Sequence, residues 1–244
     1  MVAARLSEWS GKGWSLTISP AGVHVVQPSG TLTIAAAEAA SLDVRTGWFR
    51  LALQRDGRRV ARLRGISRPE ARRLQLAVRH MAALPELEAA VGWHSEVLSL
   101  LESARVDQCW VTTEVLDGLL ESRPHLGLPA RTALARAESM FTPAQLAAVT
   151  FLDSDLVGLV ASTNEEILAA ELSSRREFFA NIEKTPLTDE QARAVACFDN
   201  RVQVLAAAGS GKTSVMVARA AYAVHRGFVG PERILLLAFN RASR

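Results

Sequence analysis

Alternating apolar and polar positions predict several short strands near the N-terminus. The strand-like segments, each bounded by turn residues, are residues 14–18, 23–26, 48–54 and 59–64. The last two flank Asp56-Gly57, and an Asp-Gly pair between alternating segments is a strong hairpin signal. Arginines interrupt the alternation of the final strand, so we expect Arg59, Arg62 and Arg64 to face water or a ligand.

A helical pattern follows these strands. Ser67 is placed as an N-cap, with Glu70 three residues later to complete a capping box. Apolar residues then recur every three or four positions as far as Leu84-Pro85, where we expect the helix to end. Several strands closed by one amphipathic helix describe a small β-rich domain over residues 1–85, similar in layout to pleckstrin-homology-like (PH-like) modules.

The middle of the chain, residues 86–183, is predicted to be helical. The segments that suit helices, separated by Pro and Gly breaks, are residues 86–104, 111–121, 130–140, 143–152 and 162–179. We find no group of catalytic residues in them. His94 and His125 stand alone, whereas metal ligands occur in clusters, so we expect both to be structural or exposed.

The pattern changes again at residue 184. A short helix capped by Thr188 is followed by an apolar strand over 201–206, a glycine-rich loop, a helix over 214–225 and a second apolar strand over 234–239. Strand, loop, helix and strand form one βαβ unit of a parallel sheet. The sequence thus predicts an α+β multidomain protein whose third part, residues 184–244, begins an incomplete α/β domain.

Charge is unevenly distributed along the chain. Residues 1–80 carry a net charge of +8, residues 84–183 a net charge of −10, and residues 184–244 a net charge of +5. The first and last blocks are therefore candidates for contact with a polyanion, although the blocks could also balance one another as solvated faces.

Composition excludes several classes of protein. Hydrophobic residues make up 49% and charged residues 22% of 244 residues, the balance of a globular protein. Neither a secretory signal nor an apolar run long enough to cross a bilayer is evident. Cys109 and Cys197 are far apart and suit neither a disulfide framework nor a metal cluster. We expect a cytoplasmic protein with no membrane partner.

The glycine-rich loop carries the chemistry. Backbone N–H groups of such a loop, together with the positive end of the following helix, form a nest for phosphate anions. Lys212 should reach the β- and γ-phosphates of ATP, and the Thr213 hydroxyl should take one place on Mg²⁺. The first glycine of the usual pattern is replaced by Ala206, which fits if that residue stays extended. The expected nucleotide-binding residues of the loop are Ala208, Gly209, Ser210, Gly211, Lys212 and Thr213.

Three ordered segments resemble superfamily 1 helicases of the UvrD/Rep type. Residues 187–195 are similar to the Q motif, residues 206–213 to motif I and residues 234–239 to the start of motif Ia. Gln191 and Lys212 are 21 positions apart, as in that family. The order of a basic β-rich part, a helical part and these motifs is similar to the helicase IV group, and the resemblance implies a RecA-like fold for the last part.

The resemblance also implies roles for two further residues. Gln191 would contact the adenine base through its amide, and Phe239 would meet single-stranded DNA, where an aromatic ring can stack on a base. Implied cofactors are ATP and Mg²⁺, and the implied partner is single-stranded or partly duplex DNA. The implied activity is ATP-dependent unwinding in the 3′-to-5′ direction.

The family's Walker B acidic pair, arginine fingers and second motor domain would follow residue 244. We therefore expect no catalytic residue in this chain, and unwinding only in a longer protein of which the chain is the N-terminal part. Two alternatives stay open. One is a module that binds nucleic acid and nucleotide without turnover, and the other is a P-loop NTPase unrelated to nucleic acid.

Overall fold

The protein is described by a computed structural model. The residues that it describes are 7–11, 13–19, 21–35, 38, 42–47, 50–55, 57–137, 141–183, 185–207 and 209–237. The chain divides into two compact units, one of residues 1–95 with 123–154 and one of residues 96–122 with 155–244. The α+β class is confirmed, while the domain boundaries at residues 85 and 183 stay predictions.

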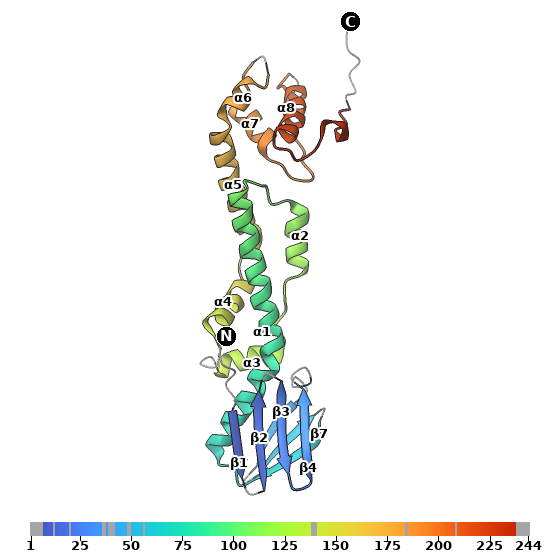
Figure 1. Ribbon diagram of the computed structural model, residues 1–244. Coiled ribbons are helices and arrows are strands. Elements are labelled where there is room, and N and C mark those ends of the chain that lie inside the picture. The colour runs from blue at the N-terminus through green and yellow to red at the C-terminus, as the bar shows by residue number, and fades with distance from the viewer. Residues whose placement is uncertain are drawn as a thin grey trace. The chain divides into compact units, whose positions relative to one another are not determined.

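The first unit contains two antiparallel sheets, shown in blue and cyan in Figure 1. The first sheet, in the order of its strands, comprises β1 (Ser7–Gly11), β2 (Trp14–Ser19), β3 (Gly22–Gln27) and β4 (Gly30–Ala35). The second comprises β5 (Leu42–Gly47), β6 (Arg50–Arg55) and β7 (Arg58–Arg64). The strands predicted over 14–18, 23–26 and 59–64 are present, and β6 covers residues 50–54 of the strand predicted over 48–54, of which residues 48 and 49 lie outside the described part. Strands β6 and β7 pair as the predicted hairpin, with Arg55 opposite Arg58.

Both sheets bury one face against a shared core. Leu16 of β2, Leu53 of β6 and Leu63 of β7 are fully buried in one cluster. Helix α1 (Arg68–Val106) adds Leu74 and neighbouring apolar residues to that cluster. Ser67 begins the helix as predicted, because its backbone N–H donates to Glu70 Oε2 at 3.0 Å and the Glu70 N–H donates to Ser67 Oγ at 3.4 Å.

The prediction that this helix ends at Leu84-Pro85 is wrong. Helix α1 continues through Pro85 to Val106. Proline removes one backbone donor, which usually breaks a helix, but the Pro85 side chain is exposed. On either side of it, Ala83 and Leu87 are fully buried against Ala130 and Phe141. Packing of these neighbours outweighs the local preference of proline.

Two shorter helices complete the first unit, α3 (Leu128–Ala137) and α4 (Pro143–Leu152). Helix α4 begins at a capping box in which the Thr142 N–H donates to Gln145 Oε1 at 2.9 Å. The predicted segments 130–140 and 143–152 thus correspond to helices, with residues 138–140 outside the described part of the chain.

The second unit is helical. Its helices after the end of α1 are α2 (Thr113–Glu121), α5 (Leu156–Ser174), α6 (Arg176–Asn181), α7 (Asp189–Ala196), α8 (Lys212–His225) and the 3₁₀ turn η3 (Pro231–Arg233). The single helix predicted over 162–179 is two helices, because the chain turns at Arg175. Val195 and Ala218 are fully buried where α7 packs on α8.

The two predicted buried strands of this unit are not formed. Residues 202–207 and 234–237 have no regular secondary structure, and residues 238–239 lie outside the described part. Leu205 is 85% exposed and Leu235 is 79% exposed. A strand needs a neighbour to satisfy its N–H and C=O groups, and no strand among the described residues pairs with either segment.

No single helix among the described residues is long and apolar enough to cross a membrane. The consecutive helices α4 and α5 reach that length and composition only as a pair, which is bent by 93° at the break between them.

Leu63→Ala should lower the free energy of unfolding of the first unit by roughly 2–5 kcal/mol, because it leaves a cavity in a fully buried site. Val26→Ala is the control in the same unit, since Val26 is 48% exposed and its truncation should cost less than about 0.5 kcal/mol. Urea unfolding followed by circular dichroism measures both. Equal effects of the two substitutions would contradict the described core.

Candidate functional site

The phosphate-loop sequence lies directly before helix α8. Gly209 has φ of 78° and Gly211 has φ of 83°, both in the left-handed region that side chains disfavour. Gly211 is the N-cap of α8, so the loop runs straight into the positive end of that helix. The two glycines are therefore required by backbone conformation, as the motif predicts. Ala208 lies outside the described residues.

The side chains of the loop bond to the loop itself. Lys212 Nζ donates to the carbonyl oxygens of Ala206 at 2.8 Å and Ala207 at 2.6 Å. Ser210 Oγ donates to the Ala207 carbonyl at 2.8 Å. Thr213 stands in the first turn of α8 with an exposed side chain. To bind a phosphate, the Lys212 ammonium would have to leave these two carbonyl oxygens. It would then exchange neutral acceptors for charged ones and stay hydrogen-bonded.

Gln191 lies against this loop. Its Nε2 donates to the Ser210 carbonyl at 3.1 Å. Its Oε1 accepts from the Thr188 N–H at 2.9 Å, which completes the capping box of α7. A Cβ atom added at Gly211 would stand 2.5 Å from Gln191 Nε2, so the glycine is also needed for this close approach. The fold thus brings together the glutamine and the loop that the sequence places 21 positions apart.

Arg219 of α8 fixes the other end of α7, and sequence analysis missed it. One of its terminal nitrogens, Nη1, donates to the carbonyls of Ala194, at 3.0 Å, and Cys197. The other, Nη2, donates to the Asp199 carbonyl at 3.4 Å, and the guanidinium lies 4.8 Å from the centre of the Phe198 ring. Burial lowers the pKa of Arg219. A cation that binds the last carbonyls of a helix is favoured by the helix dipole.

The segment after α7 is held from a second side. Asp199 Oδ1 accepts from the Thr113 backbone N–H at 2.9 Å, and Oδ2 accepts from the Thr113 hydroxyl at 2.7 Å. Burial acts to raise the pKa of Asp199, but the hydrogen bonds from Thr113 and Asn200 outweigh it and lower the pKa. The first turn of α2 therefore holds the segment whose carbonyls bind Arg219.

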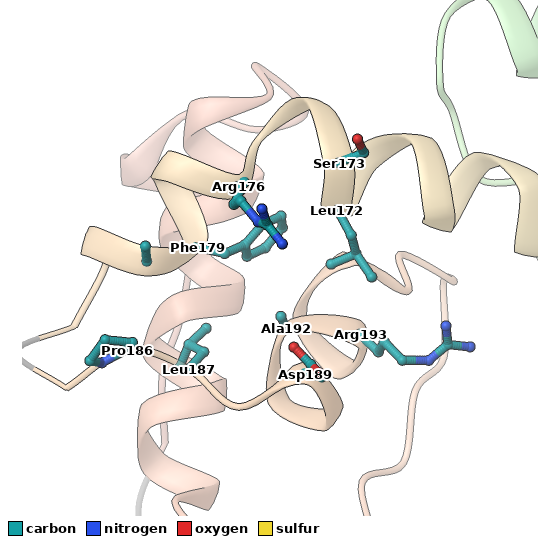
Figure 2. Close-up of a pocket in the computed structure, with 10 residues that line it drawn as sticks. Leu172, Ser173, Arg176, Phe179, Pro186, Leu187, Asp189, Ala192 and Arg193 are labelled. Atoms are coloured by element: carbon teal, nitrogen blue, oxygen red, sulfur yellow. The ribbon is translucent and has the colours of Figure 1, made fainter.

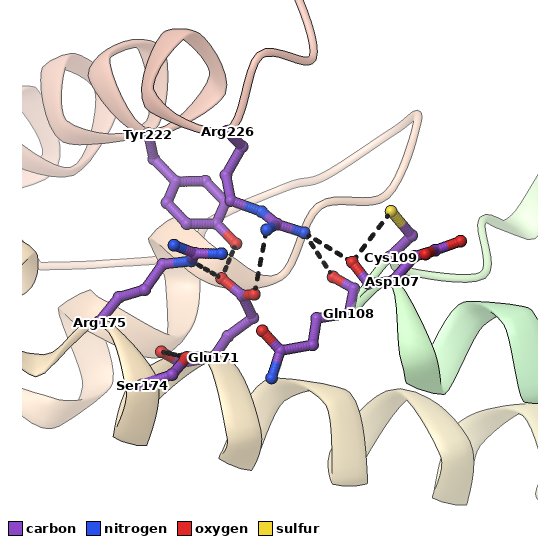
Figure 3. Close-up of polar contacts among 8 residues, drawn as sticks. All are labelled: Asp107, Gln108, Cys109, Glu171, Ser174, Arg175, Tyr222 and Arg226. Carbon is purple, nitrogen blue, oxygen red and sulfur yellow. Dashed lines mark hydrogen bonds and ion pairs between the residues drawn. The ribbon is translucent and has the colours of Figure 1, made fainter.

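A buried polar cluster holds the C-terminal end of α8 (Figure 3). Glu171 of α5 is 1% exposed, and its Oε2 accepts from Tyr222 OH and from Arg175 Nε, both at 2.7 Å. Arg226 Nη1 lies 3.5 Å from Glu171 Oε1, while Nη2 donates to the carbonyls of Asp107 at 3.1 Å and Gln108 at 2.8 Å. A buried carboxylate is tolerated when cations and donors surround it, so this cluster holds α8 to α5 and to the end of α1.

A pocket of about 570 Å³ lies on another side of α7 (Figure 2). Its lining combines apolar residues with charged ones, and neither Gln191 nor any loop residue belongs to it. The lining residues are Leu172, Ser173, Arg176, Phe179, Ala180, Pro186, Leu187, Asp189, Ala192 and Arg193. The pocket is therefore separate from the glycine-rich loop, of which Gly209, Ser210, Lys212 and Thr213 are exposed.

The remaining candidate residues join no site in the described structure. Phe239 lies outside the described residues. His94 packs on Phe151 with ring centres 4.4 Å apart, and His125 is exposed. No group of three or more His, Cys, Asp or Glu side chains suited to a metal ion occurs in the described ranges. Thr213, the one metal ligand predicted from the sequence, stays a prediction.

Comparison with known proteins adds a family to this geometry. Residues 187–244 match the UvrD/REP helicase N-terminal domain family. A 78-residue segment is 50% identical to DNA helicase IV of Escherichia coli (strain K12), covering 32% of this chain and 11% of that protein. A 59-residue segment is 41% identical to a probable DNA helicase II homolog of Mycoplasma capricolum, covering 24% of this chain and 8% of that protein. The matched segments span about a tenth of either relative, and no solved structure matches the chain.

Tyr222 gives a direct test of the buried cluster, because it is the only tyrosine in the chain. Burial is the largest cause that raises the pKa of Tyr222 above the usual 10.0, and the hydrogen bond to Glu171 is the next. Below pH 10 the phenol is protonated in the folded and unfolded chains alike; above it the unfolded chain loses its proton first. The free energy of unfolding should therefore fall as pH rises beyond about 10, and Tyr222→Phe should remove this part of the fall.

Ultraviolet absorbance of tyrosinate measures the titration, since no other residue contributes a tyrosinate signal. The folded chain should ionise at higher pH than the chain unfolded in urea, and Tyr222→Phe is the blank. Ionisation of the folded and unfolded chains at the same pH would show that the Glu171 cluster is not formed.

Proposed function

We propose that this chain, whose residues 187–244 are homologous to the N-terminal part of UvrD/REP helicases, binds ATP with Mg²⁺ at its glycine-rich loop. In this proposal the chain is the N-terminal part of an ATP-dependent DNA helicase that moves 3′-to-5′ along DNA. The contact of Gln191 Nε2 with the Ser210 carbonyl carries the proposal. It is a specific contact between the two motifs that the helicase family shares, formed by residues 19 positions apart.

Each residue of the loop has a physical role in the proposal. The backbone N–H groups at the start of α8 favour an anion, and the left-handed glycines allow the tight turn. Lys212 exchanges the Ala206 and Ala207 carbonyls for phosphate oxygens. The Thr213 hydroxyl, exposed beside the loop, takes one place on Mg²⁺.

Adenine recognition falls to Gln191 in this proposal. Both ends of its amide are occupied, by Thr188 on one side and Ser210 on the other. The Ser210 contact is at a loop that must rearrange for phosphate, so Nε2 is the end that becomes available to a base. Arg219 holds the far end of α7 and thereby sets where Gln191 lies.

A second candidate function is a module that binds nucleic acid and nucleotide without turnover. The exposed arginines of β7 favour it, since they belong to a unit that does not contain the phosphate loop. ATP hydrolysis with and without single-stranded DNA, measured on this chain and on a longer protein that contains it, separates the two functions. DNA-stimulated turnover in the longer protein alone supports the helicase, and turnover in neither supports the binding module. The remaining features of the proposal are a cytoplasmic location, DNA contact at Phe239 and a PH-like identity for the β-rich part.

Lys212→Ala should weaken binding of a fluorescent ATP analogue by roughly 10- to 150-fold, the equivalent of one hydrogen bond to a charged group. Arg233→Ala is the control, because it removes one exposed positive charge away from the loop. Gln191→Ala should weaken ATP binding but leave inorganic triphosphate binding unchanged. Wild-type affinity in Lys212→Ala would refute nucleotide binding at this loop.

A further inference from the structure

Sheet β5-β6-β7 carries arginines on its outer face. Ala61 and Leu63 of β7 are 5% and 0% exposed and point into the core. Arg62 and Arg64 alternate with them and are exposed. Because successive side chains of a strand point to opposite faces, these two arginines lie side by side on the surface of the sheet, about 6.8 Å apart along the strand.

A register shift adds a third arginine to this face. Leu53 pairs with Ala61 but Gln54 pairs with Arg59, so Val60 is the extra residue of a bulge. Simple alternation would send Arg59 inward. With the bulge, Val60 packs against the core and Arg59 is exposed opposite Gln54. The local irregularity of β7 therefore gathers arginines on one side of the sheet.

A fourth arginine comes from the opposite edge. Arg45 of β5, Ala52 of β6 and Arg62 of β7 are register partners in one row across the sheet. Arg45 and Arg62 are exposed, and the small Ala52 between them leaves the row flat. Neighbouring strands are about 4.8 Å apart, so the row is about 10 Å wide. We call Arg45, Arg59, Arg62 and Arg64 the arginine face.

The backbone under this face is held in place. Trp14 Nε1 donates to the Arg64 carbonyl at 2.7 Å, and Gln27 Nε2 donates to the Arg62 carbonyl at 2.8 Å. Both donors come from the other sheet of the same unit, and they provide hydrogen-bond partners for two backbone carbonyls at the edge of β7. The backbone that carries Arg62 and Arg64 is therefore held by hydrogen bonds from the other sheet. A fixed backbone lowers the entropy lost when the two side chains are ordered around a ligand.

Clustered like charges disfavour the folded state unless a counter-charge neutralises them. Among the described residues, Arg59 and Arg64 form no ion pair, and the register sets two further arginine pairs opposite each other, Arg50 with Arg64 and Arg55 with Arg58. Arg55 is the register partner of the buried Leu42, so it belongs to the other face, where it pairs with Glu38 at 2.9 Å. On the outer face the register places one acidic residue, Asp43 opposite Gln54, against the four arginines, which leaves a surplus of positive charge.

We propose that the arginine face binds the phosphate backbone of a nucleic-acid strand. Planar guanidinium groups bind phosphate with two parallel hydrogen bonds, and their spread over two edge strands suits an extended polyanion. Gln54, half-buried between them, adds a donor and an acceptor. A membrane surface is the less suitable partner, because interfacial binding also requires apolar side chains to insert, and Ala52 and Gln54 at the centre of the face offer none.

Fluorescence anisotropy of a labelled single-stranded oligonucleotide with the whole chain, without nucleotide, tests the proposal. Four arginine contacts predict a slope of about −2.8 for log affinity against log salt, from about 0.7 per contact. The double variant Arg59→Gln/Arg64→Gln should lower the slope by about 1.4 and weaken binding about 25-fold at about 0.1 M salt. Circular dichroism and thermal unfolding confirm that each variant is folded.

The matched control is Arg176→Gln/Arg201→Gln, which removes the same charge from exposed positions in the second unit. It should bind nearly as the wild type does, and so should Lys212→Ala, because the arginine face does not use the phosphate loop. Failure of Lys212→Ala to bind ATP while it retains the oligonucleotide would support both proposals independently. Equal weakening by the two double variants, loss of the oligonucleotide in Lys212→Ala, or binding to anionic lipid vesicles but not to the oligonucleotide would overturn this inference.

Discussion

Helix α8 and its C-cap carry two half-buried arginines, Arg219 and Arg226, and a guanidinium that is partly removed from water needs acceptors around it. Arg219 finds the carbonyls at the end of α7, and Arg226 finds Glu171 and the carbonyls of Asp107 and Gln108. These requirements fix α8 relative to α7, α5 and the end of α1. The position of the glycine-rich loop follows, because this loop leads directly into α8.

The contact between Gln191 and the loop is a consequence of this arrangement. Arg219 bonds to the last turn of α7, and Thr188 caps its first turn. Because both ends of the helix are held, Gln191 lies where its amide reaches the Ser210 carbonyl. Both partners of this contact lie within residues 187–244, which match the UvrD/REP helicase N-terminal domain family. The first unit is held together in another way. Its two sheets share an apolar core, and the side chains of Trp14 and Gln27 donate hydrogen bonds to backbone carbonyls of β7.

Local signals predicted much of this structure. Capping boxes at Ser67 and Thr188 are formed by the expected partners, and the Asp-Gly hairpin joins β6 to β7. The helix end at Pro85 was predicted wrongly, because tertiary packing of Ala83 and Leu87 overrides the local effect of proline. The strands over 201–206 and 234–239 failed for a related reason. Apolar character alone does not make a strand, and these segments have no described neighbour with which to pair.

The sequence by itself determined the motifs, because glycine conformation, capping and lysine chemistry act over a few residues. It identified Gly209, Gly211 and Lys212 as parts of one glycine-rich loop, and it predicted that Arg59, Arg62 and Arg64 face water or a ligand. Only the tertiary structure decided what those motifs contact. Arg219 meets carbonyls 20 to 25 positions away and Tyr222 meets a carboxylate 51 positions away, and such pairings depend on how helices pack rather than on any local pattern.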